Sequence, residues 1–132
     1  MLLVKTKVAP SAAHGLGLFA DQFIPNGTRI WEFNDAVDSR FDESRLAGLS
    51  EIEQEELLKH TYVNPRTMLY VYCGDDARYF NHSDHPNTED VGYDEGIVNG
   101  EGVTIAARDI HPGEEIFTDY KSFDADARNG EL

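Results

Sequence analysis

The stretch RYFNHSDHPNT, residues 78–88, concentrates side chains that could do chemistry. It holds the histidines His82 and His85, the acid Asp84, and the amides Asn81 and Asn87. Imidazole and carboxylate groups bind metals or transfer protons. Asn, Ser and Asp side chains also hydrogen-bond the nearby backbone and stabilise irregular loops. The residue types leave a metal loop, an acid/base site and an ordered polar loop as alternatives.

The spacing of the histidines argues against a metal site. His82, His85 and Asp84 offer nitrogen and oxygen ligands, but a catalytic zinc uses three ligands oriented by further hydrogen bonds. No pair has a spacing such as HExxH. The other histidines lie in segments that we predict as loop, helix end and turn, namely His14, His60 and His111.

A nucleophilic site is no better supported. Ser83 lacks the flanking glycines of a nucleophile elbow. Cys73 lies in an apolar, strand-like run, where a buried and inert thiol is the expected state. It is also the single cysteine, which excludes an internal disulfide and a cysteine-based zinc cluster.

Length and charge restrict the function further. The 132 residues fit one domain with a modest core. A balance of 11 basic against 25 acidic residues gives a net charge of -14, which opposes nucleic-acid binding. This charge fits either a cationic protein partner or a solubilising surface. The opening Met1–Val4 is too short for a signal sequence and no run is long enough to span a membrane, so we expect a cytoplasmic protein. Nothing indicates an oligomeric state.

The surrounding elements are mostly short strands joined by turns. Strand-like patterns cover residues 2–8, 28–33, 67–73 and 115–120. Turn signals occur at Pro25-Asn26-Gly27, at Pro112-Gly113, and at Asn99-Gly100, where a hairpin would join residues 97–98 to 103–106.

A helical insert is predicted at about residues 42–61. Ser50 and Glu53 have the spacing of a capping box. An imperfect apolar stripe accompanies them, made of Leu46, Leu49, Ile52, Leu57 and Leu58. The acidic tail, about residues 124–132, is expected to fray.

Two segments of the chain share one pattern. Ala20, Ile24, Gly27 and Ile30 repeat in spacing as Ala106, Ile110, Gly113 and Ile116. The pattern of each segment predicts a bend, a Pro-containing turn and a strand with an aromatic residue. Two such units favour small sheets packed around a centre over a helical bundle or a doubly wound fold.

The polar stretch resembles the RFINHSCxPN motif of SET-domain protein lysine methyltransferases. Three more segments resemble motifs of this family in the same order. HGLGLFA at 14–20 is similar to GxGxFA, IWEF at 30–33 to a strand ending in Glu-Tyr, and GEEIFTDY at 113–120 to GEELxxDY. Together they span residues 14 to 120. The length and the tail DYKSFDADA are most similar to small stand-alone microbial members.

This resemblance implies a mainly β, β-clip-like fold in which small sheets surround a C-terminal pseudoknot, with residues 1–132 forming a single SET domain. It also implies methyl transfer from S-adenosyl-L-methionine to a lysine of a basic protein or peptide. The implied cofactor-binding residues are Gly15, Leu16, Gly17, Leu18, Tyr62, Asn81, His82, Tyr120 and Phe123. An ordinary core position is the alternative for Tyr62.

Tyr120 matches the essential tyrosine of the family and would position the methyl group and the amine. An apolar, aromatic channel favours the neutral amine that must attack. Phe33 and Tyr79 would line this channel or belong to the core, and Thr118 stands where relatives place an aromatic that helps set the number of methyl groups added.

Departures from the family pattern refine these expectations. Asp84 replaces the usual Cys, and no cysteine cluster follows residue 120, so the zinc-binding segment of many relatives is absent and we predict no metal. Phe33 replaces a channel tyrosine and removes one hydroxyl. The leading hypothesis is a protein lysine methyltransferase, and the alternative is a non-catalytic module for protein interaction or cofactor sensing.

Overall fold

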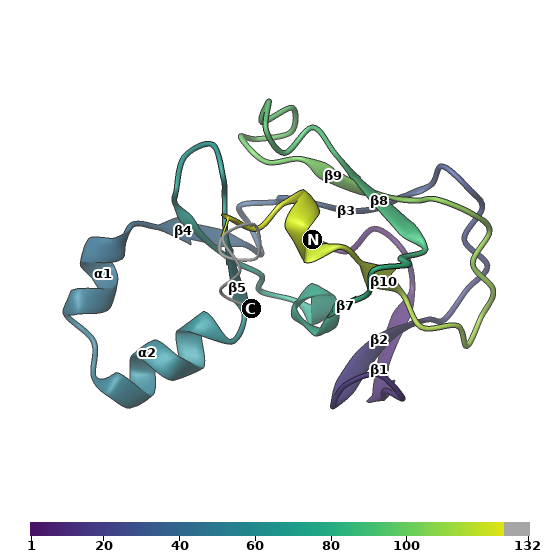
Figure 1. The fold of residues 1–132 in the computed structure, drawn as a ribbon, viewed down its shortest axis with the longest axis horizontal. Coiled ribbons are helices and arrows are strands. Elements are labelled where there is room, and N and C mark those ends of the chain that lie inside the picture. Colours follow the sequence, from purple (N-terminus) through teal and green to yellow (C-terminus); the bar gives the residue numbers. More distant parts are fainter. Residues whose placement is uncertain (126–132) are drawn as a thin grey trace.

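The computed structural model describes residues 1–125, which fold into many short strands and few helices (Figure 1). The helices are α1 (Glu43–Ala47) and α2 (Glu51–Leu58), with 3-10 turns η1 (Asp76–Tyr79) and η2 (Tyr120–Ser122). The strands are β1 (Thr6–Pro10), β2 (Leu16–Ala20), β3 (Arg29–Glu32), β4 (Ser39–Phe41), β5 (Thr61–Val63), β6 (Tyr70–Tyr72), β7 (Asn81–His82), β8 (Thr88–Val91), β9 (Val103–Ala106) and β10 (Phe117–Thr118).

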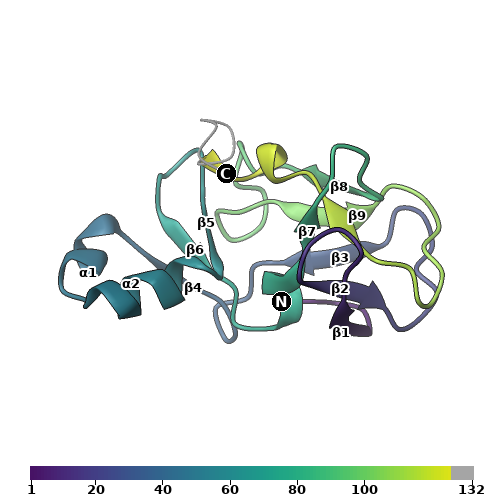
Figure 2. The same ribbon diagram turned by 60° about the horizontal axis from the view of Figure 1, so that its bottom comes forward.

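Within residues 1–125 the strands form four small sheets. β1 pairs with β2, β3-β9-β8 and β4-β6-β5 form three-stranded antiparallel sheets, and β10 pairs in parallel with β7. The helices α1 and α2 lie at one end of the molecule, and the connections β2–β3 and β9–β10 form the other end (Figures 1 and 2). This arrangement confirms the predicted fold of several small sheets.

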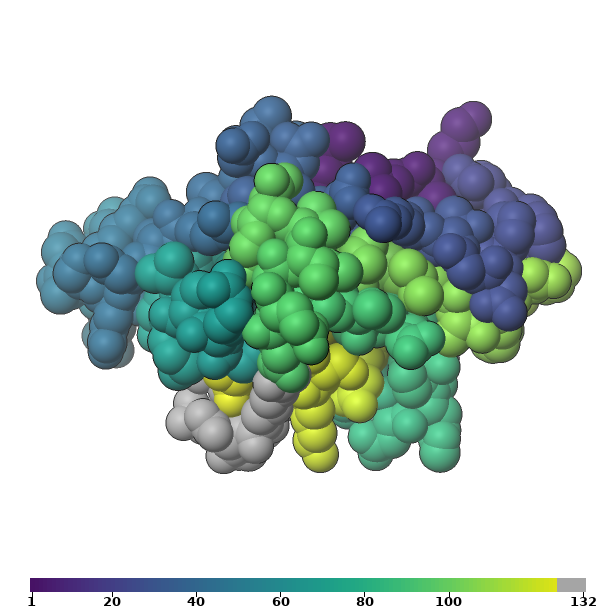
Figure 3. Space-filling view, turned by 90° about the horizontal axis from the view of Figure 1, so that it is seen from above, coloured from purple at the N-terminus to yellow at the C-terminus, as the bar shows by residue number. Residues whose placement is uncertain are grey.

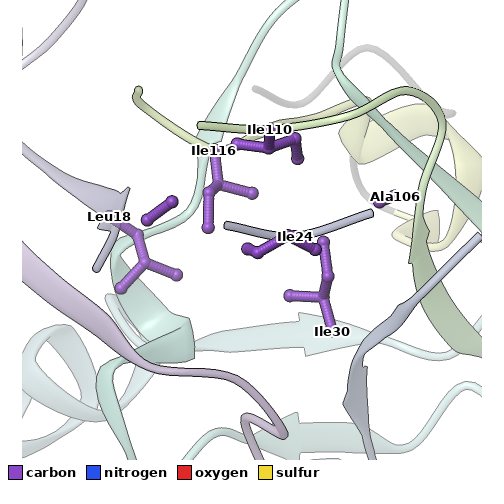
Figure 4. Close-up of a cluster of buried hydrophobic side chains, with 7 residues drawn as sticks. Leu18, Ile24, Ile30, Ala106, Ile110 and Ile116 are labelled. Carbon is purple, nitrogen blue, oxygen red and sulfur yellow. The ribbon is translucent and has the colours of Figure 1, made fainter. Parts of the chain in front are cut away.

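The two repeated segments form one core through reciprocal backbone bonds. Ile24 and Ile110 exchange N–H to carbonyl bonds of 2.8 and 2.9 Å. The Gly27 N–H donates to the Ala106 carbonyl, and the Gly113 N–H donates to the Ala20 carbonyl, both at 2.8 Å. The apolar residues of both segments then pack together, Leu18, Ala20, Ile24, Ile30, Ala106, Ile110 and Ile116 (Figure 4). The predicted repeat is therefore a pair of equivalent units around a shared centre.

The C-terminal segment passes alongside the polar stretch. β10 pairs with β7, and the Ser83 N–H donates to the Thr118 carbonyl at 3.0 Å. The Asn87 amide spans the same junction, donating to the Glu115 carbonyl and accepting from the Phe117 N–H, both at 2.8 Å. The two asparagines of this stretch and its threonine, Thr88, thus bond backbone groups, which supports the ordered-loop alternative for these residues.

The helical insert is confirmed, but its apolar stripe is not. The Ser50–Glu53 capping box is present at the start of α2. Only Leu46 of the stripe is buried, and Ile52 is 79% exposed. The helices extend from one end of the molecule and contact few residues there (Figure 3). In residues 1–125 no helix has the length and apolar character to cross a membrane.

Several predicted boundaries were wrong. The first strand covers Thr6–Pro10 and not residues 2–8, and the strand predicted at 67–73 is reduced to Tyr70–Tyr72 because Met68 has a positive φ of 59°. The predicted strand at 115–120 is reduced to Phe117–Thr118. Asn99 and Gly100 do form a turn closed by Val98 and Glu101, yet β9 pairs with β3 and β8 and not with residues 97–98.

The predicted start of the frayed tail, at about residue 124, is too early in the sequence. Asp124 and Ala125 are buried, with exposed fractions of 8% and 4%. The Asp124 carboxylate accepts the backbone N–H of Val63 at 3.1 Å, which ties this end of the chain to β5. Residues 126–132 of the predicted tail lie outside the described part of the chain.

Candidate active site

A pocket of about 220 Å³ lies where β3, β5, η1, β9 and the C-terminal segment meet. Residues far apart in the sequence form its wall, and most of them are aromatic or apolar. The lining residues are Trp31, Leu58, Lys59, His60, Thr61, Tyr62, Cys73, Ala77, Arg78, Phe80, Tyr93, Thr104, Thr118, Tyr120, Phe123 and Asp124. The structure thus brings four sequence-predicted residues into one cavity, Tyr62, Thr118, Tyr120 and Phe123.

Tyr62 packs edge to face against two other aromatic rings of the wall. Tyr62 lies 5.0 Å from Phe123 at an interplanar angle of 85°, and 6.3 Å from Trp31 at 76°. Tyr93 completes the group at 5.3 Å from Phe123. Such contacts fix ring orientations and leave electron-rich faces available to a ligand.

Tyr120 lies at the junction of this pocket with the polar stretch. Its backbone N–H donates to Nδ1 of His82 at 3.1 Å, and its hydroxyl donates a short hydrogen bond to the carbonyl of Phe80. Burial, with a smaller contribution from the Asp124 charge, raises the pKa of Tyr120 to about 12. Its hydroxyl therefore stays protonated at neutral pH and is held in one orientation.

The predicted glycine segment contacts the polar stretch directly. Nδ2 of Asn81 lies 3.1 Å from the carbonyls of both His14 and Leu16 and 2.9 Å from Oε2 of Glu115. Gly17 permits this approach, because a Cβ there would lie 2.3 Å from Glu115 Oε2 and 3.1 Å from Asn81 Nδ2. The segments 14–18 and 81–82 are thus joined beside the pocket, although neither belongs to its wall.

Of the two alternatives for Phe33 and Tyr79, channel or core, the structure places both residues in core packing. Neither Phe33 nor Tyr79 is among the lining residues, and Trp31 from β3 takes the place expected for Phe33. Phe33 follows the end of β3 and is covered by the Arg40 guanidinium, 4.0 Å from its ring centre. Tyr79 packs against the core of the two repeated segments, which contains Ile24 and Ile110.

Sequence reasoning missed two carboxylates that accept hydrogen bonds from side chains of the pocket wall. Glu101 is 1% exposed, and its Oε1 accepts from the Tyr62 hydroxyl at 2.7 Å and from the Asn64 amide at 2.8 Å. Its Oε2 forms an ion pair with Arg40 at 3.2 Å. Asp90 accepts from the hydroxyls of two pocket threonines. Among so many acidic residues, no sequence signal distinguishes the buried ones.

Metal-binding and thiol chemistry find no support in the described chain. Within residues 1–125 no group of three or more His, Cys, Asp or Glu side chains is placed to hold a metal ion. Nε2 of His82 lies 3.1 Å from Oδ1 of Asp84 in an exposed contact, and neither residue lines the pocket. Burial raises the pKa of the Cys73 thiol far above its ordinary range, so this side chain stays a neutral, packed group.

Comparison with known protein families matches residues 15–121 to the SET domain. The chain belongs to the SET-domain family. An Arabidopsis thaliana protein named "Putative histone-lysine N-methyltransferase ASHH4" is 33% identical over 122 residues, which cover 89% of this chain and 33% of that protein. The chain therefore spans about a third of the length of this curated relative.

Solved structures support the same SET fold. A "putative histone methyltransferase" of Plasmodium falciparum has a TM-score of 0.59 at 18% identity, covering 90% of this chain and 95% of that chain. A humanized mutant of the Chaetomium thermophilum Polycomb Repressive Complex 2 has a TM-score of 0.63 at 23% identity, covering 95% of this chain and 16% of that chain. The predicted SET architecture is therefore confirmed.

Proposed function

We propose that this SET domain transfers a methyl group from S-adenosyl-L-methionine to the ε-amine of a lysine in a basic protein or peptide. One observation carries the proposal. Tyr120, matched to the essential tyrosine of the family, has its hydroxyl fixed by Phe80 in an aromatic pocket beside the joined segments 14–18 and 81–82. The name of the Arabidopsis relative supports the same activity.

The pocket fits the proposed cofactor chemically. Nε1 of Trp31 and Nε of Arg78 are buried polar groups of the wall without a hydrogen-bond partner in the described residues. An unpaired buried N–H costs about 1–3 kcal/mol, which a ligand with acceptor atoms recovers. The rings of Tyr62 and Phe123 suit a sulfonium cation and a flat adenine base. When bound, the cofactor would supply an electrophilic methyl group.

The chain's own contribution would be orientation and exclusion of water. The Tyr120 hydroxyl hydrogen is donated to Phe80, so its oxygen lone pairs can accept an N–H of the substrate amine. The aromatic wall disfavours a charged ammonium and thereby favours the nucleophilic amine. Because no oxyanion forms in such a displacement, alignment of the reacting groups provides most of the catalysis.

The charge of the protein supports a basic substrate. A net charge of -14 attracts a lysine-rich segment and accelerates its encounter with the pocket. The apolar side chain of Leu58, at the end of α2, lines the pocket, is 41% exposed and would contact such a segment. The proposed reaction uses no metal ion.

The test measures binding and transfer separately. Calorimetry with S-adenosylmethionine should show binding for wild type and for Tyr120→Phe, while transfer of labelled methyl to basic proteins should fall at least about 100-fold in Tyr120→Phe. Tyr79→Phe is the matched control, because Tyr79 lies outside the pocket wall, and it should keep wild-type transfer. Equal transfer by wild type and Tyr120→Phe would contradict the role of Tyr120. Binding without transfer to any basic protein would instead assign a cofactor-sensing module.

A further inference from the structure

The proposed reaction requires a group that accepts the lysine proton, and Tyr120 is unsuited to this. A lysine side chain is protonated at neutral pH, since its free pKa is about 10.4. The hydroxyl hydrogen of Tyr120 is already donated to Phe80, and burial raises the pKa of Tyr120 to about 12. Its neutral phenol is a weak base, so the proton must reach another group.

A carboxylate lies directly behind the pocket wall. Asp90, on β8, accepts the Thr118 hydroxyl on Oδ2 and the Thr104 hydroxyl on Oδ1, each at 2.7 Å. Both threonines line the pocket and are 1% and 4% exposed, respectively. Asp90 is therefore separated from the cavity by a single layer of hydroxyl groups.

The directions of these hydrogen bonds leave one oxygen available. Thr104 gives its only hydroxyl hydrogen to Asp90, so the Tyr93 hydroxyl, 3.2 Å away, must donate to Thr104. Thr118 also gives its hydrogen to Asp90, and within residues 1–125 no group donates to the Thr118 hydroxyl in return. Its lone pairs can therefore accept an N–H from a substrate amine in the pocket.

The groups around Asp90 make it a stronger base than an ordinary aspartate. Its charged neighbours are Glu89 on β8 and Asp119 after β10. The Thr104 hydroxyl on β9 bonds Asp90 directly, and the Tyr93 hydroxyl bonds Thr104. Burial is the main cause that raises the pKa of Asp90 to about 6, and the threonine bonds oppose it. Such a carboxyl is mostly ionised at pH 7 and yet accepts a proton readily.

We propose that Asp90 accepts the proton of the substrate lysine through the hydroxyl of Thr118. The ammonium N–H passes its proton to Oγ1 of Thr118 while the Thr118 hydrogen moves to Oδ2 of Asp90. The freed nitrogen lone pair then forms the N–C bond to the methyl carbon as the C–S bond breaks and its electron pair stays on sulfur. Asp90 afterwards releases its proton to solvent. This inference rests on the proposed function.

The test is the pH dependence of kcat/KM between pH 6 and 10 for four variants. Asp90→Asn keeps the size of the side chain, and Thr118→Val removes only the relay hydroxyl. In both variants kcat/KM should be about 100-fold below wild type at pH 7 and should approach the wild-type value near pH 10, where the lysine loses its proton unaided. Glu89→Gln, the exposed neighbour on β8, should follow wild type. Asp124→Asn removes the competing pocket carboxylate and should keep the pH dependence of wild type, whatever its overall rate.

Three results would overturn the inference. In the first, kcat/KM of Asp90→Asn or Thr118→Val matches wild type at every pH. In the second, kcat/KM is reduced by the same factor at every pH, as a structural defect would cause. Alternatively, Asp124→Asn could show the pH-dependent loss. Fluorescence of Trp31, the single tryptophan and a pocket residue, checks that each variant still binds the cofactor.

A measurement independent of activity separates this inference from the proposed function. In the free protein, the NMR signal of the Asp90 carboxyl carbon should titrate near pH 6 and disappear in Asp90→Asn. Titration below about pH 5 would overturn the role of Asp90 even in an active enzyme. A wild-type protein that binds no cofactor and transfers no methyl group would contradict the proposed function instead.

Discussion

Replacing Glu101 by alanine should destabilise the protein strongly, because this carboxylate joins the pocket wall to the surface. It accepts hydrogen bonds from the hydroxyl of Tyr62 and the amide of Asn64, and it pairs with Arg40. In Glu101→Ala, two donors in buried side chains lose their acceptor, at about 1–2 kcal/mol each. Arg40 is 32% exposed and can turn to water, so its unpaired charge adds little. We expect a loss of about 3 kcal/mol in the free energy of unfolding.

Urea denaturation at pH 7 measures this loss, and the melting temperature should fall by about 10–15 °C. Glu101→Gln keeps an oxygen acceptor for Tyr62 and Asn64 but removes the charge opposite Arg40, so its loss should be about half as large. Glu95→Ala, at an exposed position of the same connection between β8 and β9, is the control and should change stability by less than about 0.5 kcal/mol. A loss below about 1 kcal/mol for Glu101→Ala would refute the reasoning.

Three further substitutions test other parts of the structure. Gly17→Ala should cost at least about 1 kcal/mol in urea denaturation and weaken cofactor binding by calorimetry, because its Cβ would displace Glu115 from Asn81; unchanged values would contradict the close approach. Ser50→Ala should accelerate amide exchange in α2 about 5-fold through loss of its N-cap, and unchanged exchange would show that the cap is dispensable. Asp90 has a folded pKa near 6, above its unfolded value of about 3.9, so its contribution to stability should be lost as pH rises from about 4 to 6. Relative to Asp90→Asn, wild type should then lose up to about 3 kcal/mol in urea denaturation, and a constant difference would contradict the buried position.

The sequence predicted the parts of the site that depend on local pattern. An ordered polar loop was one alternative for the stretch at 78–88, and the family resemblance marked the glycine segment at 14–20; the structure joins the two through Asn81. The repeated isoleucines at 24 and 110 indicated two equivalent units, which exchange backbone bonds across the core. These features are encoded by residue types at fixed spacing, so they can be read without tertiary information.

Features that depend on long-range burial could not be predicted. Glu101 and Asp90 look like any other acidic residue of a highly charged chain, and only the fold places them behind aromatic and hydroxyl groups. Trp31 and Phe33 lie two residues apart in a strand-like segment and share one core cluster, yet only Trp31 lines the pocket, while Phe33 follows the end of β3 and is covered by Arg40. The exposed Ile52 shows the converse, since an apolar stripe on a helix predicts burial only where a neighbouring surface exists.

The proposal that this SET domain methylates lysine is tested most directly by the chemical identity of the product. After incubation with a basic protein and S-adenosylmethionine carrying a labelled methyl group, the protein is hydrolysed and its amino acids are separated. The label should be recovered as ε-N-methyllysine, and Tyr120→Phe should reduce it at least about 100-fold. Label on another residue, or no label from a protein that binds the cofactor, would contradict the proposed function.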